Sequence, residues 1–487
     1  MGQEHLDRLS AVDASFLHQE GPDSHMHIGA LVTLEGPAPD LEDFLDVLRG
    51  RLHLVPRYRQ RLAFPPAGSG RPLWVDDPDF SLEYHVRHTA LPAPGSEEQL
   101  RNLVARIYSQ RLDRDKPLWE LWVVEGLADG SWALITKTHH SLIDGIAGID
   151  IATVLFDVTP VPREVEHPNR PWQPHRQPAT VDLVAAGIRG AIRTGIKTAQ
   201  SAIESLADPA RSLAVAREAA EGVGEIAWAT LNPAPTTPLN VPIGPHRRFC
   251  GVRGRLSDFK LVKDVYGGTV NDVVLTAVAG GLRRWLRLRG VRTEGLELRA
   301  LVPVSTRGND RRGDTGNSIV VMRGPLPVYI ADPIERLHTV RVAMDGLKSS
   351  KQALGAEVIS KLEDFAPPTI LGVASRLNFS TRLFNLLVTN VPGPQIPLYV
   401  LGREMQIVYP IAFLPKEHGL AIAIISYNGW LNFGLLGDYD ALPDLETIGD
   451  AIEASMDELV TLARAERDRR AAAGEPAAGA APTPAQS

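Results

Sequence analysis

Runs of hydrophobic residues separated by short polar breaks fill the first part of the chain, and their spacing predicts strands that alternate with helices. Two apolar runs, Leu121–Leu127 and Trp132–Thr138, are predicted to be strands. Asp129-Gly130 between them is typical of a hairpin turn. Helical spacing of apolar residues predicts helices over Leu41–Leu48 and Leu100–Ile107. This part of the chain therefore has the pattern of an α/β domain.

The pattern changes after Pro160, where a stretch rich in proline, histidine and arginine is typical of a linker. Two alanine-rich helices are predicted beyond it, over 181–206 and 209–231, and the proline-rich segment that follows ends them. A second α/β region begins near Phe249. Its last helix is predicted to begin at Asp444, directly after a proline, and its apolar face consists of Leu445, Ile448, Ile452, Met456 and Leu459.

A chain of 487 residues is longer than one hydrophobic core usually supports, so we expect more than one domain. We divide it into an N-terminal domain over residues 1–165, a linker and helical crossover segment over 166–245, and a second α/β domain over 246–470. Residues 471–487 form a tail rich in alanine, proline and glycine that we expect to be disordered.

Composition and charge narrow the range of functions. The chain has 51 Lys and Arg against 58 Asp and Glu, a formal charge of −7, and no long basic run, which disfavours nucleic-acid binding. Cys250 is the only cysteine, so no intrachain disulfide can form, and we interpret it as a structural thiol. The first residues lack the apolar core of a signal peptide, and no apolar stretch has the length of a transmembrane helix. We expect a cytoplasmic protein, with peripheral association at the inner membrane or at lipid droplets as an alternative.

The segment His139-His140-Ser141-Leu142-Ile143-Asp144-Gly145 directly follows the second predicted strand, and Gly145–Phe156 is predicted to form a helix. An imidazole titrates near neutral pH, so a histidine at a strand end is well placed to take a proton from an alcohol. His140 is therefore our candidate general base. If its pKa is unperturbed, activity should fall as the pH drops through about 6.5.

The other residues of the motif have supporting interpretations. Asp144 lies near the start of the predicted helix, where it could orient His140 as the acid of a catalytic triad does. His139 is interpreted as structural, because adjacent residues of a strand face opposite sides. Gly145 would allow the backbone to approach closely beside the base.

With these residues the chain resembles the bacterial wax ester synthase/diacylglycerol acyltransferases, which belong to the larger group of CoA-dependent acyltransferases. The resemblance covers nearly everything from Leu9 to about Leu462. Besides the histidine motif, the blocks that carry it are Leu9–Leu17, Met26–Gly29, Trp74–Phe80, Tyr84–Val86, Leu112–Glu120, Pro245–Phe249, Thr269–Leu275, Val302–Arg307, Gly316-Asn317 and Asn390–Pro394.

The resemblance implies a fold and an activity. The fold would consist of two chloramphenicol-acetyltransferase-like αβ sandwich domains with mixed sheets, joined by a helical crossover segment. The activity would be transfer of a long-chain acyl group from acyl-CoA to diacylglycerol, to a fatty alcohol, or to both. Acyl-CoA would be a co-substrate, with no further cofactor and no metal, and no acyl-enzyme is required because a thiolate leaves readily.

The resemblance also implies roles for residues outside the motif. Asp144 would point away from the base and pair with an arginine, for which Arg307 is the candidate; otherwise Arg307 forms a surface ion pair of little consequence. Asn271-Asp272 opens an apolar helix and is expected either as an ordinary N-cap or as lining of the active site. In the second case Asn271 would hydrogen-bond the substrate or the developing oxyanion, and Asp272 would also contact substrate.

The predicted helix over 181–206 has a stripe of isoleucines beside cations, namely Ile188, Ile192 and Ile196 beside Arg189, Arg193 and Lys197. This pattern is typical of an interfacial helix on anionic lipid. It is equally typical of a helix that docks on the protein while its long cations reach outward, and we favour that interpretation.

Four other functions compete with lipid acyl transfer. His139 and Asp144 have the spacing of glycerol-phosphate acyltransferases, but the later blocks do not fit those enzymes. A condensation-type domain acting on carrier-bound acyl donors would be expected beside a carrier region, which this chain lacks. A catalytically silent lipid-surface protein of the same fold would not need an intact His140. A metal site is disfavoured because adjacent histidines project apart.

Overall fold

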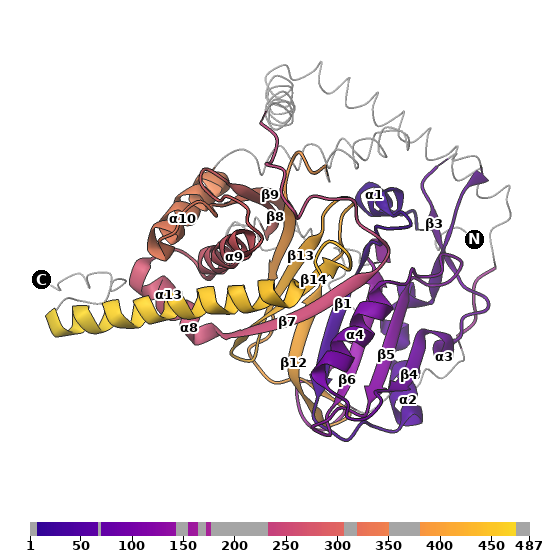
Figure 1. Ribbon diagram of the computed structural model, residues 1–487. Coiled ribbons are helices and arrows are strands. Elements are labelled where there is room, and N and C mark those ends of the chain that lie inside the picture. Colours follow the sequence, from indigo (N-terminus) through magenta and orange to yellow (C-terminus); the bar gives the residue numbers. More distant parts are fainter. Residues whose placement is uncertain are drawn as a thin grey trace, which may run out of the picture.

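The computed structural model describes residues 7–66, 70–142, 154–163, 172–176, 232–305, 319–349 and 380–473 (Figure 1). Two six-stranded sheets, both mixed, dominate these residues, and a two-stranded ribbon accompanies them. In order across the first sheet lie β11 (Tyr399–Val400), β12 (Arg403–Ile411), β1 (His27–Leu34), β6 (Trp132–His139), β5 (Trp119–Glu125) and β4 (Val86–Ala90). The second sheet contains β7 (Arg247–Arg255), β14 (Trp430–Asp438), β13 (Leu420–Tyr427), β10 (Leu386–Val391), β8 (Leu298–Ser305) and β9 (Ile319–Leu326), and the ribbon pairs β2 (Gln60–Ala63) with β3 (Leu73–Asp76).

The helices separate into two groups along the chain. The first half contributes α1 (Ala11–Gln19), α2 (Leu41–Arg51), α3 (Leu82–His85), α4 (Glu97–Tyr108) and the short 3₁₀ turns η1 (Leu52–Leu54), η2 (Pro56–Arg59) and η4 (His140–Leu142). The second half contributes α8 (Leu256–Tyr266), α9 (Val270–Leu288), α10 (Pro333–Ser349) and α13 (Leu445–Ala473). Among the described residues, no helix is long and apolar enough to cross a membrane.

The local predictions of the first half are confirmed. β5 and β6 pair antiparallel as a hairpin, and Gly130 in the turn between them has the positive φ of 77° that a tight turn favours. The two predicted helices are α2 and α4, and polar side chains begin both. Asp40 caps α2, and Ser96 forms a capping box with Gln99 at the start of α4.

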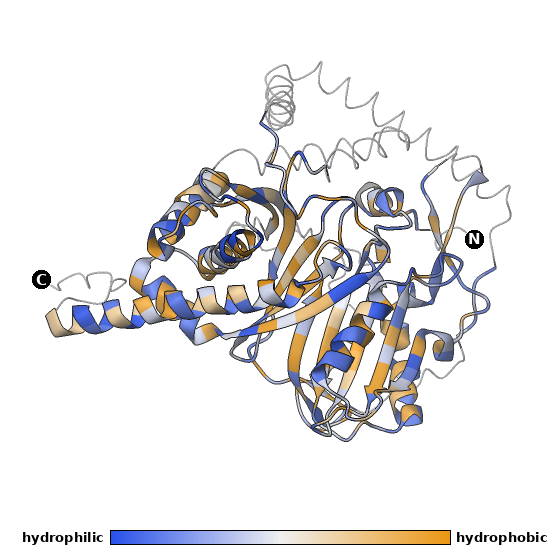
Figure 2. Ribbon diagram, in the orientation of Figure 1, coloured by the Kyte–Doolittle hydropathy of each residue, from blue (hydrophilic) through white to orange (hydrophobic). Residues whose placement is uncertain are grey.

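The last helix of the chain is also confirmed, with a longer C-terminal end than expected. α13 begins at Leu445, and all five residues of its predicted apolar face are buried. Figure 2 shows hydrophobic and hydrophilic residues alternating along this helix. It continues to Ala473, so residues 471–473 are helical and are not part of a tail. The rest of the predicted tail, the helices predicted over 181–206 and 209–231, and most of the helix predicted after the motif lie outside the described residues.

The core of the second half explains why α9 is apolar on almost all sides. α9 packs against α13, α10 and α8 and against the second sheet, and every residue from Asp272 to Leu282 is buried. A helix that is enclosed on all faces needs apolar residues all round rather than along one stripe. Gly281 permits the closest approach of α9 to α13, because its position directly faces the backbone of Ile452.

One feature of the first sheet was not foreseen from the sequence. β12 comes from the C-terminal part of the chain but pairs antiparallel with β1, and the ladder runs from Gly29 opposite Ile411 to Leu34 opposite Met405. Figure 1 shows β12 beside β1 at the boundary between the two halves. A separate hydrophobic cluster fills the space between the sheets, with contributions from both halves such as Phe16, Leu31, Phe384 and Phe413. The two halves are therefore joined by a hydrogen-bond ladder as well as by an apolar interface.

The tight contact at Gly281 gives a test of the fold. In Gly281→Ala the new Cβ would lie 2.8 Å from the backbone N and Cα of Ile452, so α9 and α13 must move apart. We expect a loss of about 1–3 kcal/mol in the free energy of unfolding, the usual range for overpacking. Urea denaturation measures it. The control is Gly346→Ala on α10, where nothing lies within 4 Å of the new Cβ. A Gly281→Ala protein as stable as the control would contradict this packing.

Candidate active site

The histidine motif begins at the end of β6, where the strand turns into η4. His139 is the last residue of β6 and His140 the first residue of η4. The backbone N–H of His140 donates to the carbonyl oxygen of Met26 at 2.8 Å, which continues the β1–β6 ladder by one step. His140 is therefore positioned by the backbone of the sheet itself, a rigid support for a reactive side chain.

Two phenylalanines from distant parts of the chain enclose the His140 ring. Phe16 of α1 stacks on it with ring centroids 3.9 Å apart and an angle of 23° between the planes. Phe413, two residues beyond β12, meets it edge-on with centroids 5.7 Å apart. His140 is thus held between the N-terminal helix and the strand that the C-terminal part adds to the first sheet.

The enclosure determines the charge state of His140. Its Nδ1 atom is buried and has no hydrogen-bond partner among the described residues, although the residue as a whole is partly exposed. Burial disfavours the charged form and, with the proximity of the His139 ring as a second cause, lowers the pKa of His140 to about 4. The condition of an unperturbed pKa near 6.5, on which the expected pH dependence rested, is therefore not met. At neutral pH the ring is uncharged and able to accept a proton.

His139 points away from His140 into a buried polar cluster. Its Nδ1 atom lies 2.6 Å from the Ser141 hydroxyl and accepts a hydrogen bond from the Ser141 backbone N–H at 3.1 Å. Its Nε2 atom faces Glu20 Oε2 at 3.6 Å. The ring is 1% exposed, which agrees with a supporting position.

Glu20 is the centre of this cluster. It caps the C-terminus of α1, its carboxylate is 1% exposed, and it is bound by Arg114, whose Nε donates at 2.8 Å. Arg111 and His27 also lie within 4 Å of it. Burial by itself would raise the pKa of Glu20, but the neighbouring His139 ring and the hydrogen bonds and charge of Arg114 outweigh it and lower the pKa to about 2. Glu20 is therefore ionised at every pH at which the protein would be assayed.

The structure corrects the interpretation of Asn271-Asp272 as an N-cap. The residue that caps α9 is Thr269, whose hydroxyl accepts from the Asp272 N–H, while the Asp272 carboxylate accepts from the Thr269 N–H at 2.8 Å. This reciprocal capping box, with Asp272 fully buried, gives that residue a structural role, and its contact with substrate stays a prediction. Asn271 instead faces β10, and its Oδ1 accepts from Nδ2 of Asn390 at 3.1 Å.

Asp144, Gly145 and Arg307 lie outside the described residues, so the proposed pairing of Asp144 with Arg307 stays a prediction. The interpretation of Cys250 as a structural thiol agrees with the structure. Cys250 is buried on β7, and burial raises the pKa of its thiol to about 12, which suits an unreactive thiol. Trp119 is 1% exposed and donates its indole N–H to the carbonyl of Tyr58. Among the described residues, no group of three His, Cys, Asp or Glu is placed to hold a metal ion.

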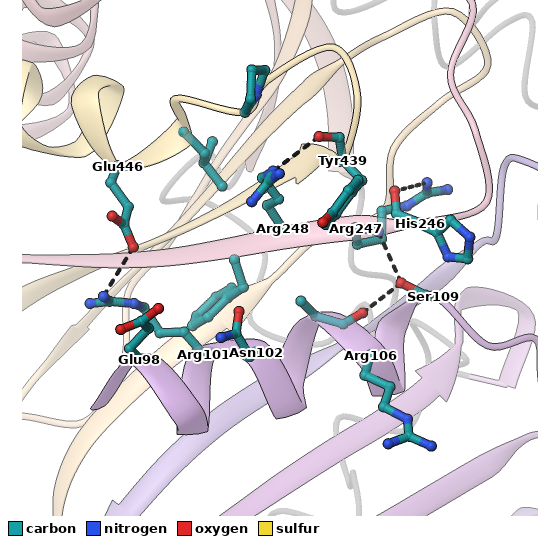
Figure 3. Close-up of a pocket in the computed structure, with 14 residues that line it drawn as sticks. Glu98, Arg101, Asn102, Arg106, Ser109, His246, Arg247, Arg248, Tyr439 and Glu446 are labelled. Carbon is teal, nitrogen blue, oxygen red and sulfur yellow. Dashed lines mark hydrogen bonds and ion pairs between the residues drawn. The ribbon is translucent and has the colours of Figure 1, made fainter. Parts of the chain in front are cut away.

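Residues 246–249 of the block Pro245–Phe249 line a cleft of about 580 Å³ between α4, the start of β7 and the start of α13 (Figure 3). Most charged groups of the cleft interact with other side chains of the protein. Arg101 pairs with Glu446 at 3.0 Å, and the Arg248 guanidinium lies over the ring of Tyr439. The Arg106 side chain points away from the other residues drawn. Arg247 donates its backbone N–H to Ser109 and its guanidinium to the carbonyl oxygen of Asp23. This block therefore connects the two halves rather than forming a second reactive site.

Sequence reasoning missed the three residues that define the environment of His140. Phe16 lies in a block that carries the family resemblance, but its contact with the ring depends on how α1 packs. Phe413 follows a strand whose partner was unknown, and Glu20 stands in a loop segment without any spacing signal. These three residues are identified only by their contacts in the folded chain.

Two family models match most of the chain. The model of the wax ester synthase/diacylglycerol acyltransferase catalytic domain matches residues 9–274, and that of the C-terminal domain of the same family matches residues 315–460. The chain belongs to the wax ester synthase/diacylglycerol acyltransferase family. It is thus an acyltransferase of that family, as the motif and its accompanying blocks predicted.

Relatives in Mycobacterium tuberculosis extend over nearly the full length. A protein named probable diacylglycerol O-acyltransferase tgs1 is 36% identical over 463 residues, which cover 94% of this chain and 97% of the relative. A second, named putative diacylglycerol O-acyltransferase, is 33% identical over 93% of this chain and 90% of its own length.

Solved structures confirm the predicted fold class. The wax ester synthase/diacylglycerol acyltransferase from Marinobacter aquaeolei VT8 has a TM-score of 0.64 and 28% identity, and the match covers 94% of this chain and all of that one. The first condensation domain of the calcium-dependent antibiotic synthetase has a TM-score of 0.56 at 18% identity over 95% of this chain and 97% of its own, a likeness of fold alone. The two mixed sheets thus form the chloramphenicol-acetyltransferase-like sandwich expected from the sequence.

Proposed function

We propose that the protein transfers a long-chain acyl group from acyl-CoA to diacylglycerol, to a fatty alcohol, or to both, with His140 as the general base. The observation that carries the proposal is the state of His140, a neutral imidazole held between Phe16 and Phe413 at the end of a rigid strand. The names of the two mycobacterial relatives favour diacylglycerol as an acceptor.

The chemistry would proceed without a covalent intermediate. Because Nδ1 of His140 is enclosed, Nε2 is the nitrogen that a substrate hydroxyl would reach. As Nε2 takes the proton, the alcohol oxygen attacks the thioester carbonyl carbon and forms the new C–O bond. Collapse of the tetrahedral intermediate breaks the C–S bond, and the departing CoA thiolate takes the proton from the imidazolium. The products are an ester and free CoA.

Asn271 is the candidate donor to the oxyanion of that intermediate. Its Oδ1 already accepts from Asn390, which fixes the orientation of the amide and leaves the Nδ2 hydrogens to donate elsewhere. Asp144 and Arg307 would hold the loop that follows η4. We also propose the domain division at residues 165 and 245, with the second domain extending to the end of α13 at Ala473. β11 and β12 of the second domain join the N-terminal sheet.

The acceptor is tested directly with labelled palmitoyl-CoA. Wild-type protein is incubated separately with diacylglycerol, hexadecanol and glycerol-phosphate, and the lipid products are separated. We expect labelled triacylglycerol, wax ester, or both, and no acylated glycerol-phosphate. Acylation of glycerol-phosphate alone, or no labelled product, would overturn the proposal.

His140→Ala should abolish acyl transfer while leaving the protein folded. A positioned base typically contributes about 10²–10⁴-fold, so kcat should fall by at least that much. The matched control is His418→Ala, which removes another buried imidazole stacked on a phenylalanine, with centroids 4.2 Å apart. Thermal melting checks the fold of both variants. Turnover of His140→Ala at the rate of the His418 control would reject the base assignment.

The pH dependence follows from the lowered pKa of His140. The base works only when unprotonated, so a pKa of about 4 keeps it active below the pH at which a free imidazole is charged. We expect kcat/KM of the wild type to stay nearly constant from pH 8 down to about 5, and to fall only at lower pH. Stopped assays over that range, at constant ionic strength, measure it. An acid limb centred on pH 6.5 would show that the ring is solvated in the free enzyme.

A further inference from the structure

α1 touches the turn that carries His140 at two points. Phe16 stacks on the His140 ring, and Glu20, which caps α1, lies against His139 behind it. Arg114 fastens the end of α1 in place, because its guanidinium donates both to Glu20 and to the carbonyl oxygen of Leu17 at 3.1 Å. Arg114 thus holds both the C-terminal end of α1 and the buried carboxylate of Glu20 in place.

The hydrogen bonds of His139 specify which of its nitrogens carries the proton. The backbone N–H of Ser141 points at Nδ1 from 3.1 Å, so Nδ1 must present its lone pair. In the neutral ring the proton is then on Nε2, which faces the Glu20 carboxylate at 3.6 Å. The opposite tautomer would place the Nε2 lone pair against a carboxylate and an N–H against the Ser141 N–H. Glu20 therefore favours the tautomer in which Nδ1 can accept from the backbone N–H of Ser141 and close the turn.

We propose that Glu20 is a positioning residue for the reaction: its charge keeps His139 in the Nε2–H tautomer, so that Nδ1 can accept from Ser141 and close the turn that sets the His140 ring against Phe16. The inference rests on the proposed role of His140 as the base. Glu20 does not touch substrate in this account, and it acts only through His139 and Ser141.

The surroundings of Glu20 maintain the charge that this role requires. Arg114 contacts one carboxylate oxygen, and Arg111 and His27 approach the other at 3.6 and 3.8 Å. A carboxylate that is 1% exposed without such partners would take up a proton and lose its effect on His139. Two arginines therefore stabilise one anion beside a histidine that is itself uncharged. A role of Glu20 in orienting His139 explains why a charged carboxylate is kept at this position.

The test uses Glu20→Gln, which keeps the shape of the side chain and removes its charge. We expect kcat to fall between about ten- and a hundredfold, the range for a misplaced catalytic group, with KM for acyl-CoA and for the acceptor within about twofold of wild type. The matched control is Asp444→Asn in the second half of the chain, where a carboxylate is also held by an arginine and a ring N–H. Its kcat should stay within about twofold of wild type.

A second variant shows whether Glu20 acts through the turn. Ser141→Ala removes the hydroxyl contact to His139 and keeps the backbone hydrogen bond. If both residues act on the same ring, the kcat of the double variant Glu20→Gln/Ser141→Ala should lie within about twofold of the kcat of the less active single variant. Fully multiplied losses would show that Glu20 acts by another route and would overturn the inference.

The outcomes separate this inference from the proposed function. If His140→Ala is as active as wild type, the base assignment fails. If His140→Ala is inactive but Glu20→Gln keeps its kcat per folded molecule, then only the positioning role fails, and a lower melting temperature of Glu20→Gln would mark the cluster as merely stabilising. A rise in KM with unchanged kcat would place Glu20 in substrate binding and would also overturn the inference.

Discussion

The hydrogen-bond ladder between β1 and β12 is the constraint on which the candidate site depends. β12 belongs to the C-terminal part of the chain, yet it completes the N-terminal sheet beside β1. The other edge of β1 pairs with β6, whose last residue precedes His140. Phe413 follows β12 and Met26 precedes β1, so the ladder brings both to His140 at once. Without this pairing, the His140 ring would have one aromatic neighbour instead of two.

The enclosure of His140 has opposing effects on its chemistry. Removing water lowers the pKa of the ring to about 4 and so keeps it neutral, but it also makes the ring a weaker base. The same absence of water strengthens the electrostatic interactions of the transition state. A thioester donor suits this balance, because its thiolate leaves readily and the base needs to move one proton only. The arrangement is better suited to alcohol acylation with an activated donor than to cleavage of an unactivated ester.

The sequence predicted those helices and strands that depend on the local pattern of residues. The β5–β6 hairpin, α2, α4 and the apolar face of α13 follow from turn residues and periodicity, and the structure has all of them. The start of α9 was misplaced because two capping residues compete within Thr269–Asp272, and only the reciprocal bond of the capping box decides between them. The entry of β12 into the first sheet could not be predicted, because its partner lies far away in the sequence and strand pattern does not identify partners.

The same distinction applies to the candidate site. His140 could be found because its spacing in the motif is a local signal. Phe16, Phe413 and Glu20 are brought to it by tertiary packing, and a buried carboxylate in a loop is indistinguishable from a solvated one in the sequence. Glu20 is identified only by its exposure of 1% and by its partners Arg114 and His139.

β6 is also held by α4 on the side away from the histidines, so the strand is a firm support for His140. Lys137 is completely buried and donates to the carbonyl oxygens of Ile107 and Gln110 at the end of α4, where a cation is favourable. The hydroxyl of Tyr108 donates to the carbonyl of Thr136 at 2.6 Å. α4 thus fixes β6 two residues before the motif begins, while α1 and β12 fix it directly beside His140. A proton acceptor whose nitrogen must meet a substrate oxygen within a fraction of an ångström requires support from both directions, since slack on either side of the strand would move the ring.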